Sequence, residues 1–418
     1  MTLDASATLE VDPLIDNPAT RIIVCCGSGG VGKTTTAAAL GVRAAERGRK
    51  VVVLTIDPAR RLAQSMGIDS LDNTPRRVKG IEGEGELHAM MLDMKRTFDE
   101  IVEAHADAER ARAILENPFY QSLSAGFAGT QEYMAMEKLG QLRARDEWDL
   151  IVVDTPPSRS ALDFLDAPGR LGSFLDGKFI KLLMAPAKMG GRAGMKFLNV
   201  GMSMMTGTLG KLLGGQLLRD VQTFVAAMDT MFGGFRTRAD ATYRLLQAPG
   251  TAFLVVAAPE RDALREAAYF VERLAAEEMP LAGLVLNRVH GSGAARLSAE
   301  RALAAAENLD EGRIVDQRSG KTGVRDATGA SPESPSVDET DHTDHTTEQL
   351  TAGLLRLHAE RMQVLAREQR TRDRFTALHP EVAVAQVPAL PGDVHDLAGL
   401  RAIGDRLATG GGDPAGAA

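Results

Sequence analysis

A short glycine-rich segment near the N-terminus restricts the possible folds of this chain more than any other feature. The segment Gly27-Ser28-Gly29-Gly30-Val31-Gly32-Lys33-Thr34 has the spacing GxxxxGK[ST], between an apolar run and a helical pattern that begins at Thr34. Glycines let backbone N–H groups converge on phosphate oxygens, and the N-terminus of the following helix adds a favourable dipole. The segment therefore predicts a phosphate-binding loop. The residues expected to contact the nucleotide are Gly29, Gly30, Val31, Gly32, Lys33, Thr34 and Thr35.

The same pattern assigns chemistry to four side chains. Lys33 is expected to reach the β- and γ-phosphates as a catalytic cation, and the Thr34 hydroxyl is expected to hold Mg²⁺. Asp154 ends the apolar run Leu150–Asp154, which is where a carboxylate that binds Mg²⁺ through a water belongs. Asp57 follows another apolar run and is suited to orient or deprotonate the attacking water, although an Asp before a proline is also a common turn residue. Lys33 and Asp57 are thus the expected catalytic pair.

Short β-branched runs alternate with helical stretches, which predicts an α/β fold of the P-loop NTPase type with a mostly parallel sheet flanked by helices. One ATPase domain is expected over residues 21–412. Residues 1–20 and 413–418 are expected to be disordered, and so is the acidic loop 308–347, whose composition cannot support a core. The expected strands are 21–26, 51–56, 88–93, 150–154, 252–258, 283–287 and 382–387, and the expected helices include 34–47, 263–277 and 351–378.

Charge and cysteine content exclude several classes of function. The net charge of −8 argues against a nucleic-acid partner. The two cysteines are the neighbours Cys25 and Cys26, which point to opposite faces of a strand and so form neither a disulfide nor a metal site. Residues 1–20 lack a secretory signal, and the uncharged stretch 197–210 is too short to span a membrane, which takes roughly 20 residues. A cytoplasmic protein that can touch a membrane surface fits best.

Taken jointly, these motifs resemble the anion-transporting ATPase family, which includes the arsenite-pump ATPase and the targeting factor for tail-anchored membrane proteins. The water-positioning DPA motif of that family matches Asp57-Pro58-Ala59, and its second switch matches Asp154-Thr155-Pro156-Pro157. The run that follows Asp154 looks most like a bacterial, actinobacterial branch. The resemblance implies a dimeric ATPase that uses ATP and Mg²⁺ as cofactors and releases ADP and phosphate.

The resemblance also implies where the adenine base binds. The family grips adenine with an asparagine at the end of a late strand, which matches Asn287. A C-terminal loop closes over the base, and it matches residues 387–392. Pro388 and Leu390 are therefore expected to contact the nucleotide.

Two departures from the family pattern concern partners. The family loop usually begins with a Lys that crosses the dimer to the partner's phosphates, and this deviant Walker A loop has Ser28 there. Because a serine cannot deliver a cation to the transition state, two alternatives stay open. One is a homodimer in which Arg60 or Arg61 substitutes, and the other is a heterodimer with a paralogue that carries the first loop Lys. The chain also has no CxxC pair, so neither an interfacial zinc nor arsenite transport is expected.

Residues 170–247 interrupt the alternation of strands and helices, and they are expected to form a helical insertion. Residues 170–219 carry eight basic residues against one acidic residue. Unbranched methionines adapt to varied apolar partners, which favours capture of a hydrophobic protein client or a membrane surface. The alternative is an ordinary helical subdomain with methionine in its core. The methionines concerned are Met184, Met189, Met195, Met202, Met204, Met205, Met228 and Met231.

We therefore expect an ATPase that couples ATP binding and hydrolysis to capture of a hydrophobic protein or membrane partner. Two other functions remain open. Ser28 also fits a regulatory nucleotide-binding subunit of a heterodimer, with weak hydrolysis of its own. The phosphate loop by itself also fits a partition or division-site positioning ATPase, although that group lacks a large Met-rich insertion.

Overall fold

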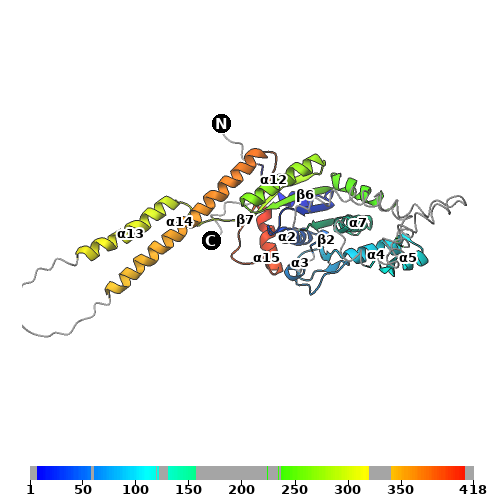
Figure 1. The fold of residues 1–418 in the computed structure, drawn as a ribbon, viewed down its shortest axis with the longest axis horizontal. Coiled ribbons are helices and arrows are strands. Elements are labelled where there is room, and N and C mark those ends of the chain that lie inside the picture. Colours follow the sequence, from blue (N-terminus) through cyan, green and yellow to red (C-terminus); the bar gives the residue numbers. More distant parts are fainter. Residues whose placement is uncertain are drawn as a thin grey trace, which may run out of the picture.

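One eight-stranded sheet organises the computed structural model, which describes residues 7–57, 61–118, 120–121, 130–156, 224, 234, 237–319 and 340–409 (Figure 1). Every pair of neighbouring strands is parallel except β3 and β4 at one edge. The predicted P-loop α/β fold is confirmed. The strands in spatial order are β3 (Arg76–Arg77), β4 (Glu86–Met91), β2 (Lys50–Thr55), β5 (Leu150–Asp154), β1 (Ile22–Cys26), β6 (Thr251–Ala257), β7 (Leu281–Val289) and β8 (Val384–Pro388).

The strand order places the predicted site residues at one edge. The chain passes from β1 over β5 to β2, and it later returns from β5 over β1 to β6, so the winding of the sheet changes direction beside β1. In open parallel sheets ligands bind outside the carboxyl ends of the strands at such a switch point. The phosphate loop follows β1, Asp57 follows β2, and Asp154 ends β5.

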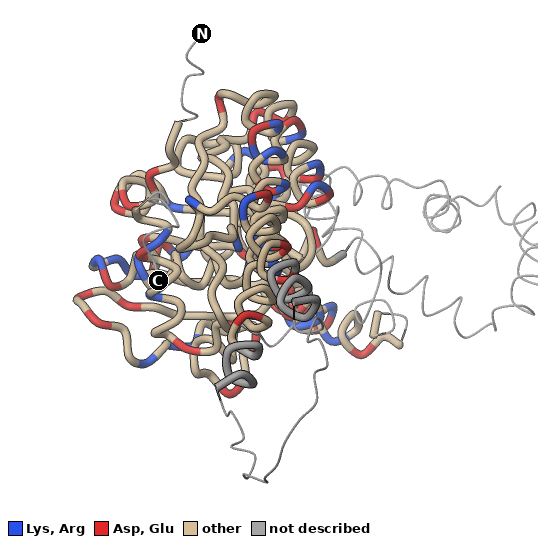
Figure 2. The backbone as a smooth tube through the Cα atoms, turned by 90° about the vertical axis from the view of Figure 1, so that its left-hand side faces the viewer, with Lys and Arg blue, Asp and Glu red and all other residues tan. Residues whose placement is uncertain are grey.

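Helices cover both faces of the sheet (Figure 1). The side chains of each strand point alternately to the two faces of the sheet. In β1, Ile22, Val24 and Cys26 belong to one hydrophobic cluster, and Ile23 and Cys25 belong to the other. Figure 2 shows the charged residues mainly on the outer helices and loops. One face carries α1 (Val11–Asp16), α2 (Lys33–Glu46), α3 (Arg61–Ser65) and α15 (Leu397–Ala408); the other carries α4 (Met94–His105), α5 (Ala108–Leu115), α7 (Thr130–Ala144) and α12 (Arg261–Ala276).

The expectation of a disordered N-terminal extension is wrong for residues 7–20. Val11 and Ile15 of α1 are fully buried. Two acidic residues of α1 pair with α2, since Asp12 accepts hydrogen bonds from Arg43 at 2.5 and 2.7 Å and Asp16 bonds Arg47. The acidic composition suggested a solvated segment, but these charges are balanced by arginines of α2.

The expectation of a disordered acidic loop is wrong at both of its ends. Helix α13 (Ala299–Ser319) runs into the loop from one side, and α14 (Thr340–Leu378) begins within it on the other. The two helices lie side by side as a hairpin that projects from the sheet (Figure 1). The two helices touch through small side chains and not through a large apolar core. The composition of residues 308–347 therefore did not indicate this contact. The buried residues at this contact are Ala302 and Ala306 of α13 and Ala352 and Ala359 of α14.

Most of the predicted insertion and the tail 413–418 lie outside the described residues. Of the insertion, the structure describes residues 224, 234 and 237–247, and the last of these segments is helical. The eight methionines named above are therefore not among the described residues. Within the part of the chain that the structure describes, no helix is both long enough and apolar enough to cross a membrane.

Candidate nucleotide site

The phosphate loop leaves β1 at Cys26 and enters α2 at Lys33, in a backbone path that requires glycine. Gly27, Gly30 and Gly32 have φ values of 146°, 78° and 97°. A Cβ atom on Gly27 would lie 2.1 Å from the carbonyl oxygen of Val256 in β6. A Cβ atom on Gly30 would meet nothing within 4 Å, so the loop curves around open space. Such a concave run of backbone amides is suited to an anion.

Lys33 lies inside this curve, with only 5% of its surface exposed. Its Nζ atom donates a hydrogen bond to the carbonyl oxygen of Ser28 at 2.8 Å. Burial lowers the pKa of Lys33, and the carboxylates of Asp154 and Asp57 oppose that shift. Both carboxylates thus act on the lysine, and a phosphate group would replace a neutral carbonyl as its partner.

Asp154 lies at the centre of the polar contacts and is fully buried. Its Oδ2 atom accepts hydrogen bonds from the Thr34 hydroxyl at 2.8 Å and from the Thr55 hydroxyl at 2.9 Å. Burial raises the pKa of Asp154 to about 6, against the two hydroxyl bonds and the charge of Lys33. The Oδ1 atom is buried and has no hydrogen-bond partner among the described residues.

These residues fit Mg²⁺. A hydroxyl at the start of α2 can bind the metal directly, and a neighbouring carboxylate can accept from a metal-bound water. The unpartnered Oδ1 atom of Asp154 offers an acceptor for that water, and a buried acceptor without a donor is uncommon. The structure therefore brings Thr34 and Asp154 together as predicted from the sequence.

Asp57 is held beside this cluster through its main chain. Its N–H group donates to the Thr55 hydroxyl at 3.2 Å, and the preceding carbonyl of Ile56 accepts from Nε2 of Gln131 at 2.9 Å. Thr55 and Gln131 were missed by sequence reasoning. Thr55 had a usable signal, because it ends β2 in register with Asp154 of β5. Gln131, in the first turn of α7, had none. Pro58 and Ala59 of the DPA motif lie outside the described residues.

Asn287 is turned toward the phosphate loop by an irregularity of β7. The register between β7 and β8 shifts after Asn287, and Arg288 has a φ of 60°, a conformation that non-glycine residues seldom adopt. The Nδ2 atom of Asn287 donates to the carbonyl oxygen of Val31 at 2.8 Å. The side chain thus supports the loop, and its contact with adenine stays a prediction.

Pro388 and Leu390 lie near the end of the same strand. Val387 is the strand neighbour of Asn287, and Pro388 follows it as the last residue of β8. Leu390 is partly buried against the hydrophobic cluster that contains Val31. The structure places both residues on the Asn287 side of the loop, and their contact with a nucleotide stays a prediction.

Comparison with known proteins agrees with this geometry. The family model of the anion-transporting ATPases matches residues 20–306. ATPase GET3 of Podospora anserina is 26% identical over 278 residues, which cover 66% of this chain and 75% of that protein. ATPase ARSA2 of Chlamydomonas reinhardtii is 27% identical over 313 residues, which cover 71% and 76%.

A third relative is matched over a shorter length. ATPase GET3 of Malassezia globosa is 29% identical over 170 residues, so the chain spans about half of that protein, 49%. These three relatives are eukaryotic, so the predicted bacterial branch stays a prediction. The match from residue 20 to residue 306 contains the phosphate loop, both carboxylates and Asn287. The chain therefore belongs to the anion-transporting ATPase family and is an ATPase built on a P-loop α/β fold.

Proposed function

We propose that this chain works as a nucleotide-gated dimer that couples ATP binding and hydrolysis to capture of a hydrophobic protein or membrane partner. The observation that carries the proposal is the position of Thr55 between the carboxylate of Asp154 and the main chain of Asp57. Its hydroxyl accepts from the N–H of Asp57 and bonds Oδ2 of Asp154. A change at the metal side of the site therefore reaches the main chain that leads from β2 to α3.

ATP binding uses the loop and the cluster as follows. Backbone amides from Gly29 to Thr35 surround the phosphates, and Lys33 exchanges the Ser28 carbonyl for a phosphate oxygen. Thr34 would hold Mg²⁺ directly, and Asp154 would hold it through a water. The metal supplies charge neutralisation for the phosphates. The amide oxygen of Asn287 is the group that can accept from the adenine amino group, while its Nδ2 atom donates to Val31.

Pro388 and Leu390 cover the base in this proposal. Pro388 ends β8 one residue beyond the strand neighbour of Asn287, and Leu390 lies on the loop that follows the strand. Their apolar surface suits the face of a purine. This step rests on the family resemblance and on their place beside Asn287.

Hydrolysis requires a base or an orienting group for water, and Asp57 fills that role. It lies at the carboxyl end of β2, with its N–H group fixed by Thr55 and the carbonyl before it fixed by Gln131. The carboxylate accepts a proton from water as the water attacks the γ-phosphorus, and Lys33 stabilises the charge on the transferred group.

Two substitutions test this assignment. Lys33→Ala should lose most of the affinity for ATP, since it removes the buried cation. Asp57→Asn should keep ATP binding and lower turnover by roughly 10²–10⁴-fold, the usual range for loss of a general base. Asp69→Asn, at an exposed carboxylate, is the matched control. Unchanged turnover in Asp57→Asn would remove Asp57 from the mechanism.

Ser28 favours a second candidate, a regulatory subunit that hydrolyses ATP weakly on its own. Its carbonyl holds Lys33 and its side chain carries no cation to donate to a partner. A cation supplied in trans can be worth about 10³–10⁵ in rate. A paralogue with the first loop Lys should therefore raise turnover on mixing, and Ser28→Lys should raise it in the homodimer. Brisk turnover by the isolated chain, unaffected by either change, would exclude the heterodimer.

Capture of a hydrophobic partner is assigned to the Met-rich insertion. Replacing Met202, Met204 and Met205 with Asp should abolish binding of an apolar helix and leave ATP binding intact. Unfolding of the variant would show that these methionines belong to the core.

Arsenite is an unsuitable ligand, because Cys25 and Cys26 are buried and burial raises the pKa of Cys26 to about 12. A cytoplasmic location, with contact to a membrane surface, is part of the same proposal.

A further inference from the structure

The last residues of β7 and those that follow it, 287–291 and here called the β7 end, have a strained backbone. Arg288, directly after Asn287, has a φ of 60°, in the left-handed region that side chains other than glycine seldom adopt. The pairing of β7 with β8 shifts in register between Asn287 and Val289. A strained conformation persists only where the surrounding structure holds it. Contacts from outside β7 are therefore needed to fix the β7 end.

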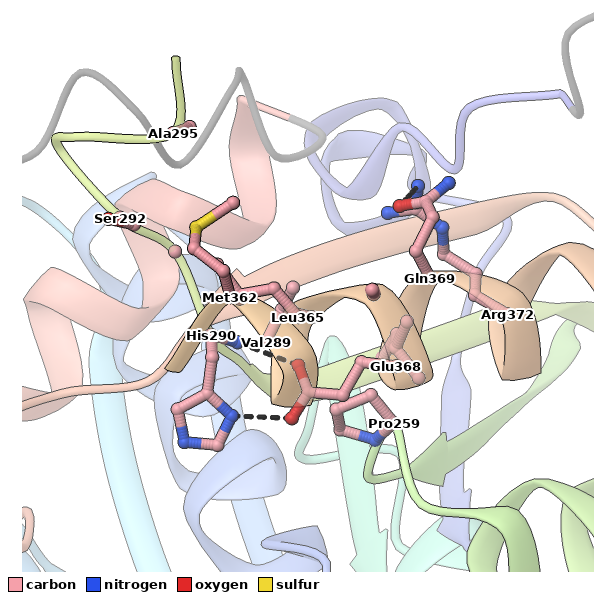
Figure 3. Close-up of a pocket in the computed structure, with 13 residues that line it drawn as sticks. Pro259, Val289, His290, Ser292, Ala295, Met362, Leu365, Glu368, Gln369 and Arg372 are labelled. Carbon is pink, nitrogen blue, oxygen red and sulfur yellow. Dashed lines mark hydrogen bonds and ion pairs between the residues drawn. The ribbon is translucent and has the colours of Figure 1, made fainter. Parts of the chain in front are cut away.

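Helix α14 supplies such contacts through two charged side chains, here called the clamp. Glu368 accepts a hydrogen bond from the N–H of His290 at 3.2 Å, and its other carboxylate oxygen lies 2.5 Å from Nδ1 of that histidine (Figure 3). Nε and Nη2 of Arg361 donate to the carbonyl oxygen of Gly291 at 2.9 and 2.7 Å. The clamp thus binds the chain three and four residues after Asn287.

The part of α14 that carries the clamp is itself fixed to the sheet. Arg361 and Glu368 are seven residues apart, about two turns, so they lie on one face of the helix. Arg372, one turn further along that face, donates to the side chain of Gln386 in β8 at 2.8 Å. Phe375 is buried in the hydrophobic cluster beyond it. The clamp therefore connects the β7 end to a rigid support.

Close packing does not fix the β7 end on this side. A pocket of about 360 Å³ separates it from α14, beside the clamp (Figure 3). The apolar lining of this pocket includes Val289 of β7 and Met362 and Leu365 of α14. Side chains in a protein core interdigitate and leave little free space. Because the pocket interrupts that packing, the polar bonds of the clamp set the separation between the β7 end and the helix.

The β7 end carries both elements that are proposed to contact adenine. Asn287 is its first residue, with the side chain turned toward the phosphate loop. Val289 accepts a hydrogen bond from the N–H of Ala389 at 2.9 Å. Ala389 lies between Pro388 and Leu390, which are proposed to cover the base. A displacement of the β7 end would therefore shift the amide of Asn287 and the covering residues together.

We propose that Glu368 is a positioning residue that selects adenine over guanine, because it holds the β7 end in the conformation that presents the amide of Asn287. Adenine carries an amino group where guanine carries a carbonyl oxygen. The amide oxygen of Asn287 can accept from that amino group and is repelled by the carbonyl oxygen. Hydrogen bonds weaken steeply with misalignment, so a relaxed β7 end discriminates less. This role rests on the proposed contact between Asn287 and adenine.

The ratio of ATP affinity to GTP affinity, measured by calorimetry, tests this role. Glu368→Ala removes both bonds to His290 and should lower the ratio about tenfold, as expected for loss of one well-placed hydrogen bond. A partly unfolded variant loses apparent affinity for both nucleotides alike, so a merely structural role would leave the ratio unchanged. Glu360→Ala, an exposed glutamate of the same helix, is the matched control and should keep the wild-type ratio.

Two further variants separate position from charge. Glu368→Gln should keep most of the preference for ATP, because an amide can accept from the N–H of His290 and donate to Nδ1 of a neutral imidazole. Arg361→Met removes the bonds to Gly291 and should lower the ratio in the same direction as Glu368→Ala. An unchanged ratio in both Glu368→Ala and Arg361→Met would overturn the proposal. Equal losses in Glu368→Gln and Glu368→Ala would assign the effect to charge and would also refute a positioning role.

A double-mutant cycle tests whether Glu368 acts through Asn287. Asn287→Ala should lower the ratio at least as much as Glu368→Ala, and the combined variant should lower it no further than Asn287→Ala does. Additive losses would show that Glu368 acts by another route and would refute the proposal, while the adenine contact of Asn287 would stand. An unchanged ratio in Asn287→Ala would remove the adenine contact itself, and the role of Glu368 with it.

Discussion

Replacing Asp154 with asparagine should make the nucleotide-free protein more stable at neutral pH, although it should abolish turnover. Asp154 is fully buried, and burial raises the pKa of its carboxyl from 3.8 to about 6. The hydroxyl bonds from Thr34 and Thr55 and the charge of Lys33 oppose this shift without cancelling it. Asparagine keeps an oxygen that can accept both hydroxyl bonds and carries no charge. The variant therefore avoids the free-energy cost of burying a carboxylate.

The magnitude follows from the two pKa values. Because the pKa is higher in the folded protein, the folded state holds the proton more tightly than the unfolded chain does. The stability contributed by the protonated carboxyl is complete below about pH 4 and is lost as the pH rises through about 6. A shift from 3.8 to about 6 corresponds to about 3 kcal/mol. Wild type and variant should thus be equally stable near pH 4 and differ by about 3 kcal/mol at pH 7.

The assay is urea unfolding of both proteins from pH 4 to 7 in buffer with a chelator. The other carboxylates titrate alike in the two proteins, so their contributions cancel in the difference. With Mg-ATP at 100 times its Kd, the wild type should gain about 2.7 kcal/mol and the variant should gain far less. A stability difference that does not change with pH, or a variant less stable than wild type at pH 7, would refute the reasoning.

Three other substitutions test contacts around the site. Gly32→Ala should weaken nucleotide binding at least about tenfold, because its Cβ would lie 2.2 Å from Nδ2 of Asn287 and its φ of 97° is strained for alanine. Arg49→Met should lower the free energy of unfolding by about 3 kcal/mol, measured by urea unfolding, because the guanidinium donates to four backbone carbonyls between α1 and β5. Gln131→Ala should lower kcat by about tenfold with little change in the KM for ATP, because it releases the main chain before Asp57.

Each of these has a control of the same kind. Gly48→Ala has a similar φ of 96°, meets nothing within 4 Å and lies outside the phosphate loop, so it should keep the affinity for nucleotide. Arg77→Met removes an exposed arginine and should leave stability within about 0.5 kcal/mol. Gln141→Ala lies on the same helix as Gln131 and should keep kcat. Equal effects of a change and its control would show that the named contact is not the cause.

The positions of the proposed site residues were predictable where they depend on local sequence. The phosphate loop is one contiguous segment, and its glycines are demanded by backbone angles that other residues rarely adopt. Asp57 and Asp154 were found because both follow apolar runs, and parallel strands share one carboxyl edge. Residues that act across the fold were not found this way. Thr55 and Asp154 are 99 residues apart in the chain, and only strand register brings them within 2.9 Å.

The sequence by itself determined the fold class, the phosphate loop and the strand-end carboxylates, because hydrophobic periodicity and turn chemistry act over a few residues. Only the tertiary structure decided that residues 7–20 are ordered, that Asn287 supports Val31, and that α14 overhangs the sheet with its leucines exposed. Acidic residues look alike in sequence whether water or an arginine of another helix surrounds them. A buried leucine and an exposed leucine cannot be told apart in the sequence, because burial depends on which distant segments pack against the residue.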